Sequence, residues 1–226
     1  VAWLDLLSTR SVRGVVTRAE HVDAPGDAAA VVRSRATVPR AWPTGALRPA
    51  MVRAFNALKY ASAPRTQRGR LEPLGRHMFP LDSIGEWPRL YGRHGLLQYQ
   101  LVVPTGSEHV LKLVIDLLRR AQAPCYLAVL KDFGPASGAP LSFPLAGWTL
   151  ALDIPRAAPG LEPLLRAFDR VVAEAGGRVY LSKDVRLALD TVRAMYPRLD
   201  EWRGARDRLD PERVWCSDLG RRVGLV

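Results

Sequence analysis

Lysine is the rarest basic side chain in this chain, and its positions are the first place to look for chemistry. Of 33 basic residues only four are lysines, at positions 59, 112, 131 and 183. Arginine keeps its proton in proteins, whereas the pKa of a lysine can be tuned by burial. Lys183 follows Tyr180 by three residues, shortly after the glycine pair 176–177. This spacing predicts a short strand that ends in a chemically usable ammonium group.

Polar side chains on three other predicted strands, over residues 96–103, 125–131 and 147–154, could join this lysine. In the first of these strands hydrophobic residues alternate with two glutamines, so both amides face the same side. Amides bind hydroxyl groups, and ammonium groups bind anions. The candidate polar groups are therefore Gln98, Gln100, Lys131, Thr149, Tyr180 and Lys183.

Each of these groups also has a purely structural interpretation. The two glutamines could lie on the solvated face of an edge strand, and Lys131 could mark a strand edge, where lysine discourages aggregation. Lys183 and Asp184 could form a surface ion pair worth less than about 1 kcal/mol. The pattern alone leaves both interpretations open.

Familiar catalytic and binding motifs are absent from the sequence. There is no G-x-G-x-x-G or Walker loop to hold a dinucleotide or a triphosphate, and no serine has a nucleophile-elbow context. The four histidines form no i, i+4 pair and the two cysteines match no metal or redox spacing, so no metal site is predicted. An active site would have to be built from polar side chains on sheet strands.

The net charge of +11 and the sequence pI near 10.4 suit an anionic partner: nucleic acid, an anionic lipid surface or a phosphorylated ligand. A solvated, arginine-rich surface would give the same balance. A basic binding module for nucleic acid or an anionic surface is the competing hypothesis, but no nucleic-acid motif is present and the aromatic residues lie in apolar contexts. No apolar run approaches the roughly 18 residues of a membrane span.

The order of predicted elements favours an α+β fold, with a mainly antiparallel sheet and helices on one face. Elements follow one another as strand-helix-strand-strand-helix-strand between residues 96 and 183. The spacing of Thr105 and Glu108 predicts a capping box for the first of these helices.

Two further elements are predicted in the first third of the chain. A short strand is expected at residues 30–32. A helix over residues 48–60 has Met51, Phe55 and Leu58 on one face, as in an amphipathic helix.

Eight blocks that run in order along nearly the whole chain carry a family resemblance: residues 1–5, 80–87, 97–100, 131–135, 139–144, 147–148, 176–184 and 195–202. They resemble the decaprenylphosphoryl-β-D-ribose 2-oxidase family, within the vanillyl-alcohol-oxidase class of flavoproteins. The resemblance implies a substrate-binding domain over residues 1–226. It would comprise a loop-rich part at 22–80, a sheet and helix core at 81–196, and a C-terminal segment at 197–226 packing toward an FAD-binding domain.

The same resemblance implies an FAD cofactor and several partners. These are an FAD-binding domain, upstream or separate, a polyprenyl-phosphate sugar substrate, and a reductase that completes an epimerisation. Peripheral membrane association in a bacterial cell-envelope pathway, the synthesis of arabinan precursors, is implied as well. Nucleic acid is not an implied partner.

The resemblance also implies roles for single residues. Lys183 would be catalytic beside the flavin and the substrate, and Tyr180 would contact the flavin. The sugar pocket would be lined by Gln98, Gln100, Lys131, Leu127, Val129, Phe133, Trp3, Thr149 and Ala151.

This chain departs from the family pattern at three of its positions. The family has asparagine at Thr149, cysteine at Ala151 and, by a looser alignment, tyrosine at Met78. Because these changes lie in the pocket wall, another sugar, alditol or lactone oxidase of the same class is an alternative.

Overall fold

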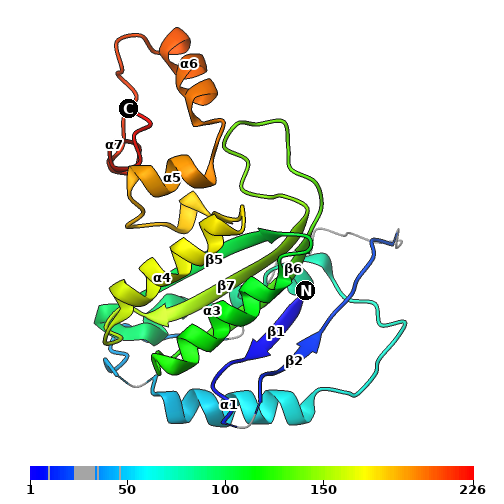
Figure 1. The fold of residues 1–226 in the computed structure, drawn as a ribbon. Helices are drawn as coiled ribbons and strands as arrows, with labels where there is room; N and C mark the ends of the chain where they lie inside the picture. Colours follow the sequence, from blue (N-terminus) through cyan, green and yellow to red (C-terminus); the bar gives the residue numbers. More distant parts are fainter. Residues whose placement is uncertain (10, 23–33, 35, 46) are drawn as a thin grey trace.

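Six strands form one sheet in the order β2-β1-β6-β7-β5-β8, and every pairing in it is antiparallel (Figure 1). The structure is a computed structural model that describes residues 1–9, 11–22, 34, 36–45 and 47–226. The strands of the sheet are β1 (Ala2–Asp5), β2 (Arg13–Val16), β5 (Leu96–Pro104), β6 (Leu127–Phe133), β7 (Gly147–Pro155) and β8 (Arg178–Val179).

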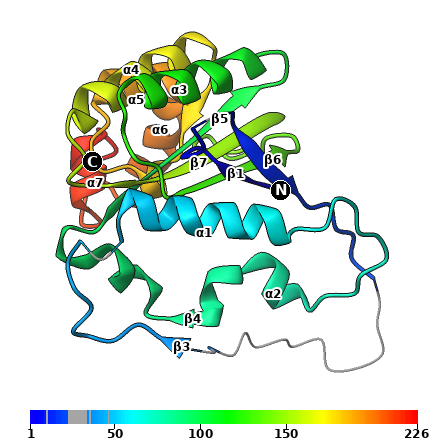
Figure 2. The same cartoon turned by 90° about the horizontal axis from the view of Figure 1, so that it is seen from below.

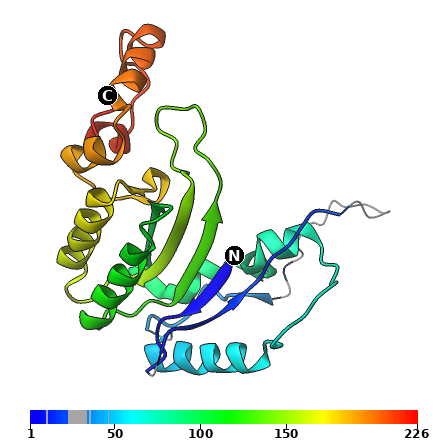
Figure 3. The ribbon, with the colours of Figure 1, turned by 45° about the vertical axis from the view of Figure 1, so that its right-hand side comes forward.

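Two helices, α3 (Glu108–Arg120) and α4 (Leu161–Glu174), cover one face of this sheet (Figure 3). Their apolar stripes bury Val114 and Phe168 completely, because these side chains pack against the strand residues that point the same way. The shared core on this side includes Leu101, Val103, Leu118, Leu150, Leu152, Leu165 and Val172. The predicted α+β fold with helices on one face is confirmed.

The other face is flanked rather than covered. Helix α1 (Pro49–Ser62) lies across the end of β1 and β2, and the 3₁₀ helix η2 (Trp87–His94) lies beside Asp153 of β7. Figure 2 shows a small parallel pair of strands on the far side of α1 from α3 and α4. This outlying region consists of β3 (Ala36–Thr37), α2 (Leu74–Met78), η1 (Pro80–Ser83) and β4 (Ile84–Gly85).

The chain after α4 is turned by a glycine pair and leaves the sheet within a few residues. Gly176 has φ of 70°, and a Cβ on Gly177 would lie 2.5 Å from the carbonyl oxygen of Val102, so this close approach requires glycine. The segment continues through η3 (Leu181–Lys183), α5 (Leu189–Met195), α6 (Leu199–Leu209) and α7 (Asp218–Arg222). The last three helices extend beyond one end of the sheet (Figure 1).

Three local predictions need correction or lie outside the described residues. The strand at β8 has two residues, so Lys183 ends a 3₁₀ turn rather than a strand. The capping box is wrong, because the Thr105 hydroxyl donates to the carbonyl oxygen of Ala146 and the helix begins after Ser107 without a side-chain cap. The strand expected at 30–32 falls outside the described residues.

Helix α1 forms where it was predicted, but the face marked by the pattern is not packed on the core. Val52 and Asn56 are the buried residues of this helix. Met51, Phe55 and Leu58 are 53%, 61% and 70% exposed.

Candidate active site

The strand register places ten of the predicted site residues on the face of the sheet that α3 and α4 leave free. Residues directly opposite each other in antiparallel strands point to the same side. Gln100 lies opposite Ala151, Ala151 opposite Val129, and Val129 opposite Trp3, which gives one continuous row across four strands. The face, called the polar face below, carries Trp3, Gln98, Gln100, Leu127, Val129, Lys131, Phe133, Thr149, Ala151 and, at the end of β8, Tyr180.

The glutamines on this face are held by hydrogen bonds to neighbouring strands. The amide nitrogen of Gln98 donates to Asp153 at 2.7 Å, and that of Gln100 donates to the hydroxyl of Thr149 at 3.2 Å. Thr149 in turn donates to the carbonyl oxygen of Leu101 at 2.8 Å. Each glutamine therefore presents its amide carbonyl as an acceptor in a fixed orientation.

Strand β5 lies between β7 and β8, so the structural alternative of an edge strand is wrong for Gln100, whose carbonyl oxygen accepts from the backbone N–H of Tyr180. Gln98 lies beyond the two residues of β5 that pair with β8. Lys131 likewise lies on an internal strand, between β1 and β7, two residues from the end of β6.

Asp153 is a site residue that the sequence interpretation missed. It is 1% exposed, lies opposite both Gln98 and Leu127, and accepts a long hydrogen bond of 3.5 Å from the hydroxyl of Tyr91 in η2. Desolvation raises the pKa of this carboxyl, while the bond from Gln98 and the charge of Lys183 act in the opposite direction. An acidic residue inside a predicted core strand was the available signal.

Aromatic rings border the polar face on the side of Tyr180. The ring of Tyr180 stacks on Phe143 with centroids 4.5 Å apart and an angle of 22° between the planes. Phe143 also meets Phe133 edge to face at 5.8 Å. The three rings form an apolar wall next to the residues that the family resemblance assigns to the flavin and the sugar.

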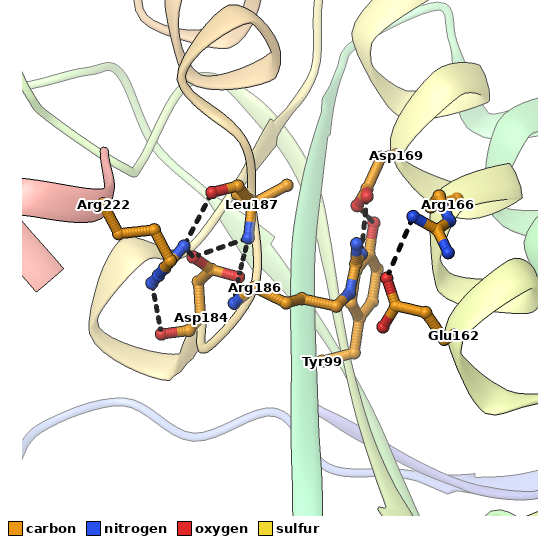
Figure 4. Close-up of polar contacts among 8 residues, drawn as sticks. All are labelled: Tyr99, Glu162, Arg166, Asp169, Asp184, Arg186, Leu187 and Arg222. Atoms are coloured by element: carbon orange, nitrogen blue, oxygen red, sulfur yellow. Dashed lines mark hydrogen bonds and ion pairs between the residues drawn. The ribbon is translucent and has the colours of Figure 1, made fainter. Parts of the chain in front are cut away.

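The turn that carries Lys183 is fixed from both sides by charged contacts (Figure 4). The Asp184 carboxylate accepts bonds from the backbone N–H groups of Arg186 and Leu187 and from Arg222 of α7 at 2.7 Å. The alternative of a surface ion pair between Lys183 and Asp184 is wrong, because the partner of the Asp184 carboxylate is Arg222.

The second contact joins the same stretch to α4. Arg186 donates to Asp169 at 2.5 Å, and Tyr99 donates to the other oxygen of that carboxylate at 3.0 Å (Figure 4). Burial raises the pKa of Asp169, and its bond to Arg186 opposes that shift. Two ion pairs, at Asp184 and Arg186, thus hold the residues directly after Lys183 to α7 and α4, which restrains the Lys183 turn without a long strand.

Three of the four lysines lie on or beside residues of the polar face, at separate places. Lys131 and Lys183 are exposed, and the Lys59 ammonium of α1 lies 4.6 Å from the ring centroid of Trp3. Desolvation lowers the pKa of Lys59. The fourth lysine, Lys112, pairs with Asp116 on the helix side of the molecule. Lys59 was not predicted as a site residue, although the rarity of lysine could have pointed to it.

The polar face fits the ring system of FAD better than its phosphates. Planar aromatic rings, two ammonium groups and oriented amides suit an isoalloxazine ring and a sugar placed against this face. The described residues on the face offer no glycine-rich turn at a helix N-terminus for a pyrophosphate. The face can therefore supply one side of a flavin site.

Other features of the described residues do not add to this site. A surface pocket of about 440 Å³ is lined by Leu97, Arg156 and the start of α4, and it contains no predicted site residue. Over the described ranges, no three His, Cys, Asp or Glu side chains lie together as a metal site would require.

An antiparallel sheet with one helix-covered face and one polar face fits the substrate domain of a flavoprotein oxidoreductase, and comparison with known proteins agrees. Residues 153–223 match the family model for D-arabinono-1,4-lactone oxidase. The chain is 41% identical to the decaprenylphosphoryl-beta-D-ribose oxidase of Mycolicibacterium smegmatis over 190 residues. The aligned residues make up 84% of this chain and 41% of that protein.

Two further relatives extend the comparison. The chain is 39% identical over 169 residues to an uncharacterized Streptomyces coelicolor protein encoded in the mprA 5' region, covering 74% of this chain and 45% of the relative. It is 30% identical over 128 residues to an L-gulono-1,4-lactone dehydrogenase of Mycobacterium tuberculosis, covering 56% of this chain and 30% of the relative.

These matches agree with the predicted resemblance, and the family model and both relatives with a named activity carry the names of oxidoreductases acting on sugars or lactones. The chain spans less than half the length of the curated relatives it matches.

Proposed function

We propose that this chain forms the substrate-binding part of an FAD-dependent oxidoreductase that oxidises a ring hydroxyl of a sugar to a ketone. The proposed substrate is a polyprenylphosphoryl-β-D-ribose, oxidised at its 2-hydroxyl during the synthesis of cell-wall arabinan precursors. The observation that carries the proposal is the polar face itself. Strand register brings its residues together, and the relative with 41% identity is named for this substrate.

The polar face would orient the sugar through its amides. The side-chain carbonyl groups of Gln98 and Gln100 can accept hydrogen bonds from sugar hydroxyls, since their amide nitrogens are engaged by Asp153 and Thr149. Leu127 and Val129 give the sugar ring an apolar floor. Lys131, exposed two residues from the end of β6, can bind the substrate phosphate as a point charge.

Oxidation of a secondary alcohol removes a hydride from the carbinol carbon, which FAD would accept when bound, and a proton from the hydroxyl, which would pass to water. Lys183 would stabilise the negative charge that develops next to it as the hydride leaves the sugar. Asp153 would act through Gln98, because it accepts a hydrogen bond from the Gln98 amide and so fixes its orientation. The ring of Tyr180 and its partner Phe143 would exclude water from one side.

Partners follow from the same proposal. The binding of the FAD phosphates would require a further domain, upstream in the same polypeptide or separate. A reductase would convert the 2-keto sugar to the arabinose epimer, because oxidation alone removes the stereocentre without resetting it.

A lactone oxidase is the second candidate function. It is supported by the family model matched at residues 153–223 and by the L-gulono-1,4-lactone dehydrogenase relative. Ala151 and Thr149 stand where the ribose oxidase family has cysteine and asparagine, so the pocket wall does not match that family at every position.

The two candidates differ in the substrate that reduces the flavin. In the full-length protein loaded with FAD and kept anaerobic, we expect polyprenylphosphoryl ribose to bleach the flavin at least about a hundredfold faster than arabinono- or gulono-lactone. Lys131→Ala should raise KM for the phosphorylated sugar and leave the weak reaction with lactones unchanged. Faster bleaching by a lactone would favour the second candidate.

A further inference from the structure

Almost all of the net positive charge of this chain comes from one segment. Residues 28–71 contain nine lysines and arginines and no aspartate or glutamate. Removing these nine from the 33 basic residues leaves 24 against 22 acidic ones. The charge is therefore concentrated and not spread over a solvated surface, as one interpretation of the composition allowed.

The helix within this segment is attached to the sheet by one narrow face. Asn56, which is 3% exposed, donates to Asp5 at 2.9 Å, and Arg13 donates to the other oxygen of that carboxylate at 2.9 Å. Val52 is buried beside Asn56, and Lys59 lies over Trp3. Val52, Asn56 and Lys59 thus fix the orientation of α1 on the rim of the polar face.

The rest of α1 faces outward and is apolar. Met51, Phe55 and Leu58 form one exposed flank, and the neighbouring exposed positions Ala50, Ala54 and Ala61 extend it. Figure 1 shows α1 at the outer end of the molecule, below β1 and β2. Large exposed apolar side chains gathered on one helix indicate a contact surface.

Arginines lie within α1 and in the segments directly before and after it. Arg48, Arg53, Arg65, Arg68 and Arg70 are exposed, and none of them forms an ion pair with an acidic residue in the described part of the chain. A helix with an apolar flank and basic residues around it is the pattern that binds the interface of an anionic bilayer. No described helix is long and apolar enough to span one.

We propose that the exposed flank of α1, Met51, Phe55 and Leu58, together with the arginines between 48 and 70, docks this protein on an anionic phospholipid surface. Phospholipid is favoured as the occupant, because an apolar flank with exposed cations beside it matches the acyl boundary and the anionic headgroups of a bilayer at the same time. It is favoured over nucleic acid, because phosphate contacts do not require three large apolar side chains.

The proposed docking also suits the proposed substrate, and this link alone rests on the proposed function. A polyprenyl chain stays in the bilayer while its phosphosugar is oxidised. Lys59 joins the docking helix directly to Trp3 on the polar face. Docking through α1 would thus hold the polar face beside the headgroups, where the sugar is presented.

The test is co-sedimentation of the full-length protein with phosphatidylcholine vesicles, with and without phosphatidylglycerol. We expect the anionic vesicles to be bound at least about tenfold more tightly, and less tightly as salt is raised. Phe55→Ser with Leu58→Ser should weaken binding about tenfold or more, since both side chains would leave the acyl boundary. Leu209→Ser is the matched control, because Leu209 is 78% exposed on α6 and should have no effect.

Two outcomes would overturn the proposal in this assay: no preference for anionic vesicles, or equal binding of the double variant and the wild type. Tighter binding of a DNA duplex than of anionic vesicles at the same salt would also overturn it. The assay requires no turnover, so its result is independent of whether the oxidase proposal holds.

A labelling experiment separates the bilayer from another part of the same protein. Leu58→Cys, in a Cys216→Ser background that leaves only the buried Cys125, should react with a maleimide without vesicles and be protected by anionic vesicles. A cysteine at 58 that is unreactive without vesicles would show that the protein covers this flank itself, which contradicts the proposal.

Discussion

The two faces of the sheet are built from the same strands, but one face packs against the helices and the other carries the candidate site. On β5, Tyr99, Leu101 and Val103 point toward the helices and are at most 3% exposed. On the same strand, Gln98 and Gln100 point to the opposite face and are half-buried. On β7 the neighbours Ala151 and Leu152 differ in the same manner. One alternating strand therefore supplies both the core and the candidate site.

This difference between the faces predicts which substitutions should lower stability and which should lower activity. The helix face owes its stability to close packing of apolar side chains, which tolerates little loss of volume. The polar face relies on a few hydrogen bonds between strands and on two ion pairs that fix the Lys183 turn. Substitutions one residue apart should therefore have effects of different kinds.

The largest effect on folding is expected from Leu152→Ala. Leu152 is fully buried, so the substitution removes apolar contacts and leaves a cavity, lowering the free energy of unfolding by about 2–5 kcal/mol. Urea unfolding measures it. A loss below that of an exposed control such as Leu113→Ala would contradict the assignment of this side to the core.

A smaller loss is expected from Arg222→Ala, which removes the cation from the 3% exposed Asp184 side chain. We expect about 1–3 kcal/mol, because the carboxylate keeps two backbone N–H donors. The rate of flavin reduction should fall too, as the Lys183 turn loosens. Arg221→Ala is the control, since Arg221 and its partner Asp218 are exposed. Equal effects of the two variants would show that the turn does not depend on Arg222.

Ala151→Leu should leave folding nearly unchanged and affect the substrate. The side chain would project from the centre of the polar face, between Gln100 and Val129, and occupy space needed by the sugar. We expect KM to rise roughly tenfold or more, with a change in unfolding free energy within about 1 kcal/mol. Unchanged KM in steady-state assays would place the sugar elsewhere.

The smallest effect concerns Asp153 and its pH dependence. The folded-state pKa of this buried carboxyl is raised, so its ionised form destabilises the fold at neutral pH. Asp153→Asn should therefore raise Tm at pH 7. The gain should shrink as pH falls through the raised pKa toward the unfolded value of about 3.9, where the wild-type carboxyl is protonated in both states. Thermal unfolding of both proteins across this range measures it, and a gain that grows toward acid would contradict the raised pKa.

Much of the polar face could be predicted from the sequence because strand alternation and family blocks point to the same residues. Gln98, Gln100, Lys131 and Thr149 were separated in sequence by up to 51 positions, and only the register shows that they share one face. The length of β8 was harder to predict from the sequence. The glycine pair marks where the preceding helix ends, but it does not show that the strand is only two residues long and is followed by a 3₁₀ turn.

Other features depend on partners that periodicity does not contain. The pattern of α1 marks Met51, Phe55 and Leu58 as one face, but the helix is held by Asn56 and Val52 instead, through a polar bond to Asp5. Asp153 escaped notice because a buried acid interrupts the apolar pattern of β7 without identifying its partners. Both are cases in which a long-range hydrogen bond decides the packing.

The most direct test of the account is anaerobic flavin reduction by polyprenylphosphoryl ribose in the full-length protein, comparing Lys183→Ala with Lys112→Ala. Lys112 is an exposed lysine paired with Asp116 on the helix side, so its loss removes the same charge away from the polar face. We predict that Lys183→Ala slows flavin reduction at least about a hundredfold while the protein stays folded and yellow, and that Lys112→Ala is unchanged. Full activity of a folded Lys183→Ala protein would contradict the assignment of the polar face as the site of oxidation.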